Sequence, residues 1–331
     1  MSDEKKLNFD QEPVEETPKK KLPVIAKIGI IGIGSIVGLF VLVWGGLNVL
    51  KYPIYYDFYS RKKDVAEIPG LNTNATPQGC TYDSVNDVIY TSSYAPTGAV
   101  IYTVKGKKSY SHVLYRNGKP FKGHVGGVAT SGNLFYIAND SRIFTISTSS
   151  LMADDKANIE IGEGQPIQNQ SSFVYADDNY VYAGEFHDGK QYQTENIYGD
   201  NHAIVEKFKI EDFTIGATTE VMPEQCISIR NKVQGFTITN EGKYVLSTSF
   251  GLASSHFYIY NADKLTDTGT TMHGAPLMSF SEVSKDLLAP AMMEDLDIYK
   301  DGTVITLTES ASNKYIFGKF FFANHIISVK I

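Results

Sequence analysis

The stretch MEDLDIYKDGTVITLTES, residues 293–310, contains two short apolar runs joined by a turn. Leu296 and Ile298 alternate with polar residues before the turn, and β-branched residues follow Gly302 in the second run. A period of two is typical of a half-buried strand, and glycine suits a tight turn between antiparallel strands. The stretch therefore predicts a β-hairpin. It carries five carboxylates, of which four lie outside the turn: Glu294, Asp295, Asp297 and Glu309.

Five copies of this hairpin recur along the chain. Their second strands read VIYTSSY from residue 88, LFYIAND from 134, YVYAGEF from 180, YVLSTSF from 244 and VITLTES from 304. The first three copies are spaced by 46 residues, which is the length of one β-propeller blade. The last two intervals are longer, and we expect insertions in HDGKQYQTENIYGDNHA (187–203) and LTDTGTTMHGAPLMSFSEVSKDL (265–287).

The register of the copies is consistent. The third residue of each second strand serves as the reference: Tyr90, Tyr136, Tyr182, Leu246 and Thr306. Four residues earlier, every copy has a residue that tolerates the backbone of a tight turn: Asn86, Gly132, Asp178, Gly242 and Gly302. The sequence therefore predicts an all-β, five-bladed β-propeller. A six-bladed ring, with one degenerate blade inside a long interval, is the first alternative, and a β-sandwich is the second.

Two sets of polar residues occupy fixed positions in the copies. Twelve residues before the reference lie Gln78, His124, Gln170, Gln234 and Glu294. Three residues after it lie Ser93, Asn139, Glu185, Ser249 and Glu309. Folding each hairpin about its turn places the two sets opposite one another, where the first strands line the central channel. We therefore expect a ligand site at one mouth of the channel, formed by Gln78, His124, Asn139, Gln170, Glu185, Gln234, Glu294 and Glu309.

This register places Glu294 directly opposite Glu309, and like charges in that position destabilise a sheet. A shared proton, a cation, or a donor such as His124 or Lys314 would compensate. The three glutamines have a second interpretation, in which they brace neighbouring blades through backbone hydrogen bonds and bind nothing.

The repeats resemble the broad bacterial β-propeller group that includes YVTN-type, WD40-like and lactonase-like proteins. GHVGGVATSGNLFYIAND (123–140) and VQGFTITNEGKYVLSTSF (233–250) look like blade openings of that group, and the resemblance covers residues 75–331. Lactonase-like propellers hold a divalent cation at the channel mouth, so the resemblance implies calcium as a cofactor. Its oxygen ligands would be Glu185, Glu294 and Glu309 together with Asn139. Five-bladed glycosidases are a further comparison, but they take acids from several first strands, where this chain has Glu294 alone.

The N-terminal segment has a different composition. Residues 1–23 are polar and charged, and we expect a disordered cytoplasmic tail. Residues 24–50 carry Lys27 as their one charge, and this length is enough for a transmembrane helix. Residues 51–76 are expected to form a stalk, and residues 77–331 the propeller. The lysines are balanced about the span, and we favour a single-pass protein of the cell membrane, with its N-terminus cytoplasmic and its large domain extracytoplasmic.

Charge and cysteine content limit the classes of function. The formal net charge of −7 argues against a nucleic-acid partner. Cys80 and Cys226 either pair in a disulfide or remain two small buried thiols.

Three classes of function stay open. The first is a membrane-tethered module that binds a small polar ligand, a glycan or a protein partner at the channel mouth. The second is a metal-assisted hydrolase, and the third treats the polar residues as bracing only.

Overall fold

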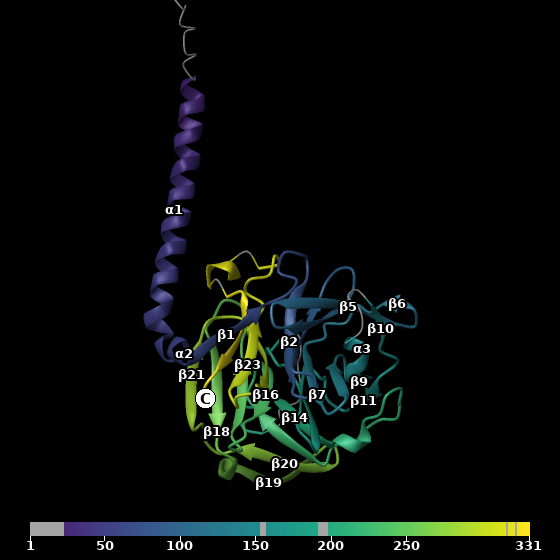
Figure 1. The fold of residues 1–331 in the computed structure, drawn as a ribbon. Helices are drawn as coiled ribbons and strands as arrows, with labels where there is room; N and C mark the ends of the chain where they lie inside the picture. Colours follow the sequence, from purple (N-terminus) through teal and green to yellow (C-terminus); the bar gives the residue numbers. More distant parts are fainter. Residues whose placement is uncertain (1–22, 153–156, 191–197, 316, 322) are drawn as a thin grey trace, which may run out of the picture. The chain divides into compact units, whose positions relative to one another are not determined.

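The computed structural model describes residues 23–152, 157–190, 198–315, 317–321 and 323–331 (Figure 1). It divides into two compact units, residues 1–46 and 47–331. Helix α1 (Val24–Ile54) begins just after Pro23 and contains Pro53 in its last turn. Its segment Ile28–Ile54 is long and apolar enough to cross a membrane. No residue in the most apolar part of this segment is buried within the structure.

Most of the second unit is β-structure, and the strands of the described residues fall into five sheets. Each sheet is one blade whose first three strands form an antiparallel meander. The reference residues of all five copies lie buried in the second strands. The five-bladed β-propeller predicted from the sequence is therefore confirmed, and the six-bladed ring and the β-sandwich are not.

The strands of each blade follow one another from the inside of the ring outwards. The first blade has β2 (Thr76–Asp83), β3 (Val88–Tyr94), β4 (Val100–Lys105) and β5 (Lys108–Arg116), with β6 (Lys119–Pro120) and β10 (Asn158–Glu160) on β5. The second blade has β7 (Gly127–Ser131), β8 (Leu134–Ala138), β9 (Arg142–Ser147) and β11 (Gln165–Pro166). The third blade has β12 (Phe173–Ala176), β13 (Tyr180–Gly184), β14 (Ala203–Lys209) and β15 (Gln225–Ile229).

The fourth blade has β16 (Val233–Ile238), β17 (Tyr244–Thr248), β18 (Ser255–Tyr260) and β21 (Lys285–Ala289). The fifth has β22 (Met293–Ile298), β23 (Val304–Thr308), β24 (His325–Val329) and β1 (Lys62–Glu67). Short helices complete the described elements: α2 (Tyr56–Arg61), α3 (Thr148–Leu151), η1 (Ile210–Asp212), η2 (Ala262–Lys264) and η3 (Gly318–Phe321).

The ring is closed by the N-terminal part of the domain. Strand β1 pairs antiparallel with β24, so it supplies the outer strand of a blade whose other strands come from the C-terminus. Figure 1 shows the blue β1 beside the yellow C-terminal strands. The expectation of a stalk over residues 51–76 is wrong for residues 62–67. This segment alternates poorly, and its partner lies more than 250 residues away, so no local pattern indicates the pairing.

The insertion between the third and fourth strands of the fourth blade forms a separate hairpin. Its strands are β19 (Leu265–Met272) and β20 (Ala275–Phe280). Strand β20 pairs in parallel with β15, so the hairpin extends the third blade and not its own. The insertion expected in residues 265–287 is thus present. Residues 191–197, in the other expected insertion, lie outside the described residues.

The inner strands approach one another closely around the axis. A Cβ atom added at Gly127 would lie 2.5 Å from the Phe173 Cα atom, and one at Gly235 would lie 2.7 Å from the Asp295 Cα atom. Glycine at these positions therefore allows backbone contact between neighbouring blades. Cys80 lies on one inner strand and Cys226 on an outer strand, and both are free, buried thiols, so the disulfide alternative is excluded.

Candidate functional site

A cavity of about 570 Å³ lies where the inner strands begin. Six of the eight predicted ligand-binding residues line it: Gln78, His124, Asn139, Gln170, Gln234 and Glu309. These residues come from all of the blades, so the propeller brings together side chains that are far apart in the sequence. Glu185 and Glu294 are buried and do not line the cavity.

The predicted cross-strand pairs do not form in direct register. The β2–β3, β16–β17 and β22–β23 ladders each shift by a bulge at the polar position, as at Gln234 between Val233 and Gly235. In the second and third blades, His124 and Gln170 precede the first residues of β7 and β12. A bulge re-aims a side chain out of the strand alternation, and Gln78 and Gln234 at two of these bulges line the cavity, whereas Glu294 at the third is buried away from it.

The glutamines divide into two groups. Gln78 is a brace, because its Nε2 donates to the Pro77 carbonyl oxygen at 2.6 Å and to Glu309 Oε2 at 3.1 Å. Gln170 and Gln234 are half-buried at the cavity wall, and their side-chain amides form no hydrogen bond with the described residues. Gln78 therefore contacts the fifth blade through a side-chain carboxylate and not through the backbone bond that the bracing interpretation expects, and the other two side chains make no bracing hydrogen bond with the described residues.

Glu309 lines the cavity, and its charge acts on Glu294, which is buried behind the cavity wall. Burial raises the pKa of Glu309 to about 7, while hydrogen bonds from Tyr315 and Gln78 and the Lys314 charge act in the opposite direction. Burial and the neighbouring Glu309 raise the pKa of Glu294 well above its usual range. Glu294 Oε1 is buried without a hydrogen-bond partner among the described residues. Of the predicted compensations, the geometry favours protonation, with the Lys314 charge as a second contribution.

Two further acids of the opening stretch, Asp295 and Asp297, hold blades together. Asp295 Oδ2 accepts hydrogen bonds from the Val128 amide at 3.0 Å and from the Cys80 amide at 3.4 Å. Asp297 Oδ2 accepts from the Thr81 hydroxyl at 2.6 Å and from the Tyr82 amide at 2.9 Å. The fifth blade thus binds the inner strands of the first and second blades through buried carboxylates.

His124 is a neutral polar residue of the wall. Its ring lies 4.5 Å from the Tyr94 ring, centroid to centroid. Burial first, and the Lys314 charge second, lower the pKa of His124. The imidazole therefore offers one donor and one acceptor at neutral pH. Beside it, Asn139 Oδ1 accepts from the Val125 amide at 3.0 Å, and Asn139 Nδ2 donates to Asp140 at 2.8 Å.

The sequence analysis missed several residues of the cavity wall. Asp140, Phe186 and Phe250 each follow the second polar set by one position in its blade, so the repeat register contained the signal. The Phe186 and Phe250 rings lie 6.2 Å apart and give the cavity an aromatic side. Tyr315 comes from the loop after β23, which the repeats do not reach.

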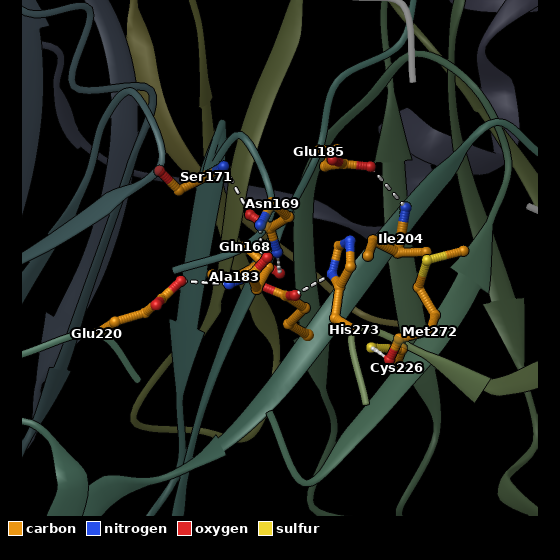
Figure 2. Close-up of polar contacts among 11 residues, drawn as sticks. Gln168, Asn169, Ser171, Ala183, Glu185, Ile204, Glu220, Cys226, Met272 and His273 are labelled. Carbon is orange, nitrogen blue, oxygen red and sulfur yellow. Dashed lines mark hydrogen bonds and ion pairs between the residues drawn. The ribbon is translucent and has the colours of Figure 1, made fainter. Parts of the chain in front are cut away.

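The structure does not bring Glu185, Glu294 and Glu309 together as a calcium site. Glu185 Oε2 accepts from the Ile204 amide at 3.2 Å, and burial raises the pKa of Glu185 to about 7. Within the described residues, the group whose ligand atoms all lie within 4.8 Å of one another is a different one: Glu206, Cys226 and His273 (Figure 2). None of these three residues is in the predicted site. One signal was present in the sequence, since Glu206 shares a strand face with the apolar, buried Ile204 and Phe208.

No protein-family model matches the sequence, and no curated protein matches it either. Solved structures do align with it. Hydrazine synthase from Kuenenia stuttgartiensis is 10% identical with a TM-score of 0.40, over 70% of this chain and 56% of that chain. The PQQ-bound aldose sugar dehydrogenase from Streptomyces coelicolor is 14% identical with a TM-score of 0.43, over 74% and 76% of the two chains.

An oxidoreductase from Thermus thermophilus, described as a glucose dehydrogenase, is 10% identical with a TM-score of 0.44, over 81% of this chain and 99% of that chain. This chain spans little more than half of the hydrazine synthase chain that it matches. At these identities and TM-scores, the fold assignment rests on the strand topology of the chain itself: it is a five-bladed β-propeller, preceded by one apolar helix that could span a membrane.

Proposed function

We propose that the protein is a membrane-anchored binding protein whose cavity takes a small, uncharged, polyhydroxylated ligand of the saccharide class. The observation that carries the proposal is the pair Gln170 and Gln234. These half-buried amides come from different blades, face one cavity, and have no hydrogen-bond partner among the described residues. Half-buried amides at a cavity wall keep donors and acceptors directed at the cavity, and a ligand hydroxyl, which both donates and accepts, would pair with them.

The rest of the wall supports a neutral ligand. His124 is neutral at physiological pH, because its pKa is lowered by burial and by Lys314. Phe186 and Phe250 provide apolar surface beside the polar groups, and a sugar ring presents an apolar face between its hydroxyls. A volume of about 570 Å³ is within the range of small-molecule sites.

Helix α1 supports the anchoring part of the proposal. Its apolar segment Ile28–Ile54 leads within eight residues to β1, the strand that closes the ring. We place residues 1–23 in the cytoplasm and the propeller on the extracytoplasmic side of the membrane, so the cavity would bind ligands at the cell surface.

The test is calorimetric titration of the full-length protein in detergent with a panel of neutral mono- and oligosaccharides. Gln170→Ala and Gln234→Ala should each weaken binding by roughly 10-fold, since a hydrogen bond contributes about 1–1.5 kcal/mol. Gln168→Ala is the matched control, because its side chain is exposed and bonded to Glu220 outside the cavity. Binding that is unchanged in both cavity variants, or no binding across the panel, would contradict the proposal.

Glu309 favours a second candidate function, hydrolysis of such a ligand. Its pKa of about 7 leaves a large fraction protonated at neutral pH, and Asp140 is a second carboxylate of the same cavity. Glycoside hydrolysis uses one protonated acid and one carboxylate. Glu309→Gln would abolish turnover and leave binding measurable, whereas a pure binding protein shows no turnover in either form.

A further inference from the structure

A second site lies on the third blade, away from the cavity. Glu206 and Cys226 are directly paired residues of the antiparallel strands β14 and β15, so their side chains project from the same face of the sheet. Both side chains are fully buried. His273 lies in the turn of the β19–β20 hairpin, and Figure 2 shows its ring close to Cys226 and Met272. None of the residues that line the cavity belongs to this group.

The hairpin reaches this position because of its register. Cys226 pairs with Leu277 of β20, and Met272 pairs with Ala275 across a two-residue turn made of His273 and Gly274. Both turn residues have positive φ, 50° and 82°, as a type I′ turn requires. The turn is thereby folded over the buried face, where His273 Nδ1 lies 2.5 Å from Glu206 Oε1. The insertion of the fourth blade thus delivers an imidazole to a buried carboxylate and a buried thiol of the third.

We infer that Glu206, Cys226 and His273 bind a zinc ion that fastens the β19–β20 hairpin to the third blade. Their candidate ligand atoms all lie within 4.8 Å of one another. Thiolate sulfur, imidazole nitrogen and carboxylate oxygen are the three donor types of protein zinc sites. Three protein ligands leave a fourth tetrahedral position for water, on the side where the His273 side chain is 26% exposed.

The surroundings fit a bound cation. Glu206 Oε2 accepts from the Asn169 amide at 3.2 Å, which fixes the carboxylate and leaves Oε1 for the metal. Cys226 Sγ donates to the Met272 carbonyl oxygen at 3.3 Å, so the thiol points toward the hairpin. As the Zn–S bond forms, the thiol proton leaves to solvent. Ligand atoms about 2.0–2.3 Å from zinc lie roughly 3.5 Å apart in a tetrahedron, so His273 moves outward by about 1 Å from its present contact.

The test uses the full-length protein in detergent, stripped with a chelator and titrated with Co²⁺ and then Zn²⁺. We expect one equivalent of cobalt to give a thiolate-to-cobalt charge-transfer absorption, and zinc to displace it and raise the melting temperature. Cys226→Ser should remove the absorption. His273→Ala should weaken metal binding by at least about 10-fold. His273 lies in a partly exposed turn, so this variant should fold and can replace Cys226→Ser if the serine variant does not.

His256→Ala is the matched control. His256 Nδ1 also faces a carboxylate, Asp286 Oδ1 at 2.9 Å, but on the fourth blade and outside the three-ligand group. This variant should bind cobalt like the unmodified protein. Absence of the charge-transfer absorption, or equal affinity in His273→Ala and the unmodified protein, would overturn the inference and leave a His–Glu ion pair beside a buried thiol.

Discussion

Replacing Asp295 tests whether its carboxylate holds the inner strands together. In Asp295→Ala, the Val128 amide loses an acceptor at 3.0 Å and the Cys80 amide loses one at 3.4 Å, and both lie in the fully buried centre of the ring. A buried N–H group without a partner costs about 1–3 kcal/mol. The shorter bond contributes most of the loss, and the small void left by the carboxylate adds about 1 kcal/mol. The expected loss in the free energy of unfolding is about 3–5 kcal/mol.

Asp295→Asn is the control that isolates the acceptor. Its side-chain oxygen can occupy the position of Oδ2, and its amide nitrogen can occupy the position of Oδ1, which has no hydrogen-bond partner among the described residues. It also removes an ionisable group whose pKa burial raises well above the usual range. We therefore expect the asparagine variant to lie within about 1 kcal/mol of the unmodified protein.

The assay is urea unfolding of the full-length protein in detergent, followed by circular dichroism of the sheet. The variants should share one denaturant slope and differ in midpoint, as expected for a change in stability alone. If Asp295→Ala unfolds within about 1 kcal/mol of the unmodified protein, or if Asp295→Asn is as damaging as Asp295→Ala, the brace contributes no stability and the reasoning fails.

The fold and its charges give three further predictions. A fragment of residues 56–331 should fold and elute as a compact species in size-exclusion chromatography. A fragment of residues 77–331 lacks β1, so the edge of β24 is unpaired and the fragment should aggregate. Equal behaviour of the two fragments would contradict the role of β1 in closing the ring. Burial raises the pKa values of Asp297 and Glu309 to about 6 and about 7, so the stability that their protonated forms contribute is complete below about pH 4 and is lost as pH rises through 6–7. The melting temperature should therefore be higher at pH 5 than at pH 8, and the difference should be smaller in Glu309→Gln. A melting temperature that rises from pH 5 to pH 8 would contradict this prediction. Gly127→Ala should destabilise by about 1–3 kcal/mol or more in urea unfolding, because its Cβ would lie 2.5 Å from the backbone of the next blade, and an unchanged midpoint would show that the strands can separate there.

The fold was predictable where its signals are local and repeated. Each copy carries its own turn residue and its own strand alternation, so the blades and their second strands follow from the register alone. Outer strands have no such signal. β11 has two residues, and β1 pairs with a strand from the opposite end of the domain. The positions of these strands in the sheets therefore depend on pairing partners that no local sequence pattern indicates. The β19–β20 hairpin was expected as an insertion, but the blade that it joins is decided by its packing on β15.

The candidate site was predicted only in part for a related reason. The repeat register located the channel mouth, and four members of the first polar set line the cavity. It did not distinguish acids that are adjacent in the sequence. Asp295 and Asp297 face neighbouring strands and accept their backbone amides, while Glu294 lies in a bulge behind the cavity. A bulge changes which way a side chain points without changing the hydrophobic pattern, so these roles could not be separated from the sequence.

Asp295 and the close glycine contacts also separate the cavity from the other end of the ring. A second cavity of about 300 Å³ lies at the other ends of the inner strands, where Tyr82, Thr130, Tyr175 and Asp297 line it. Between the two cavities, the inner strands are held together by the fully buried Asp295 and by glycine contacts too close for a side chain. Asp295 reaches from the fifth blade to Val128 of the second, so the described residues pack across the axis at this level. A ligand in the larger cavity would meet this packed layer at the inner end of the cavity.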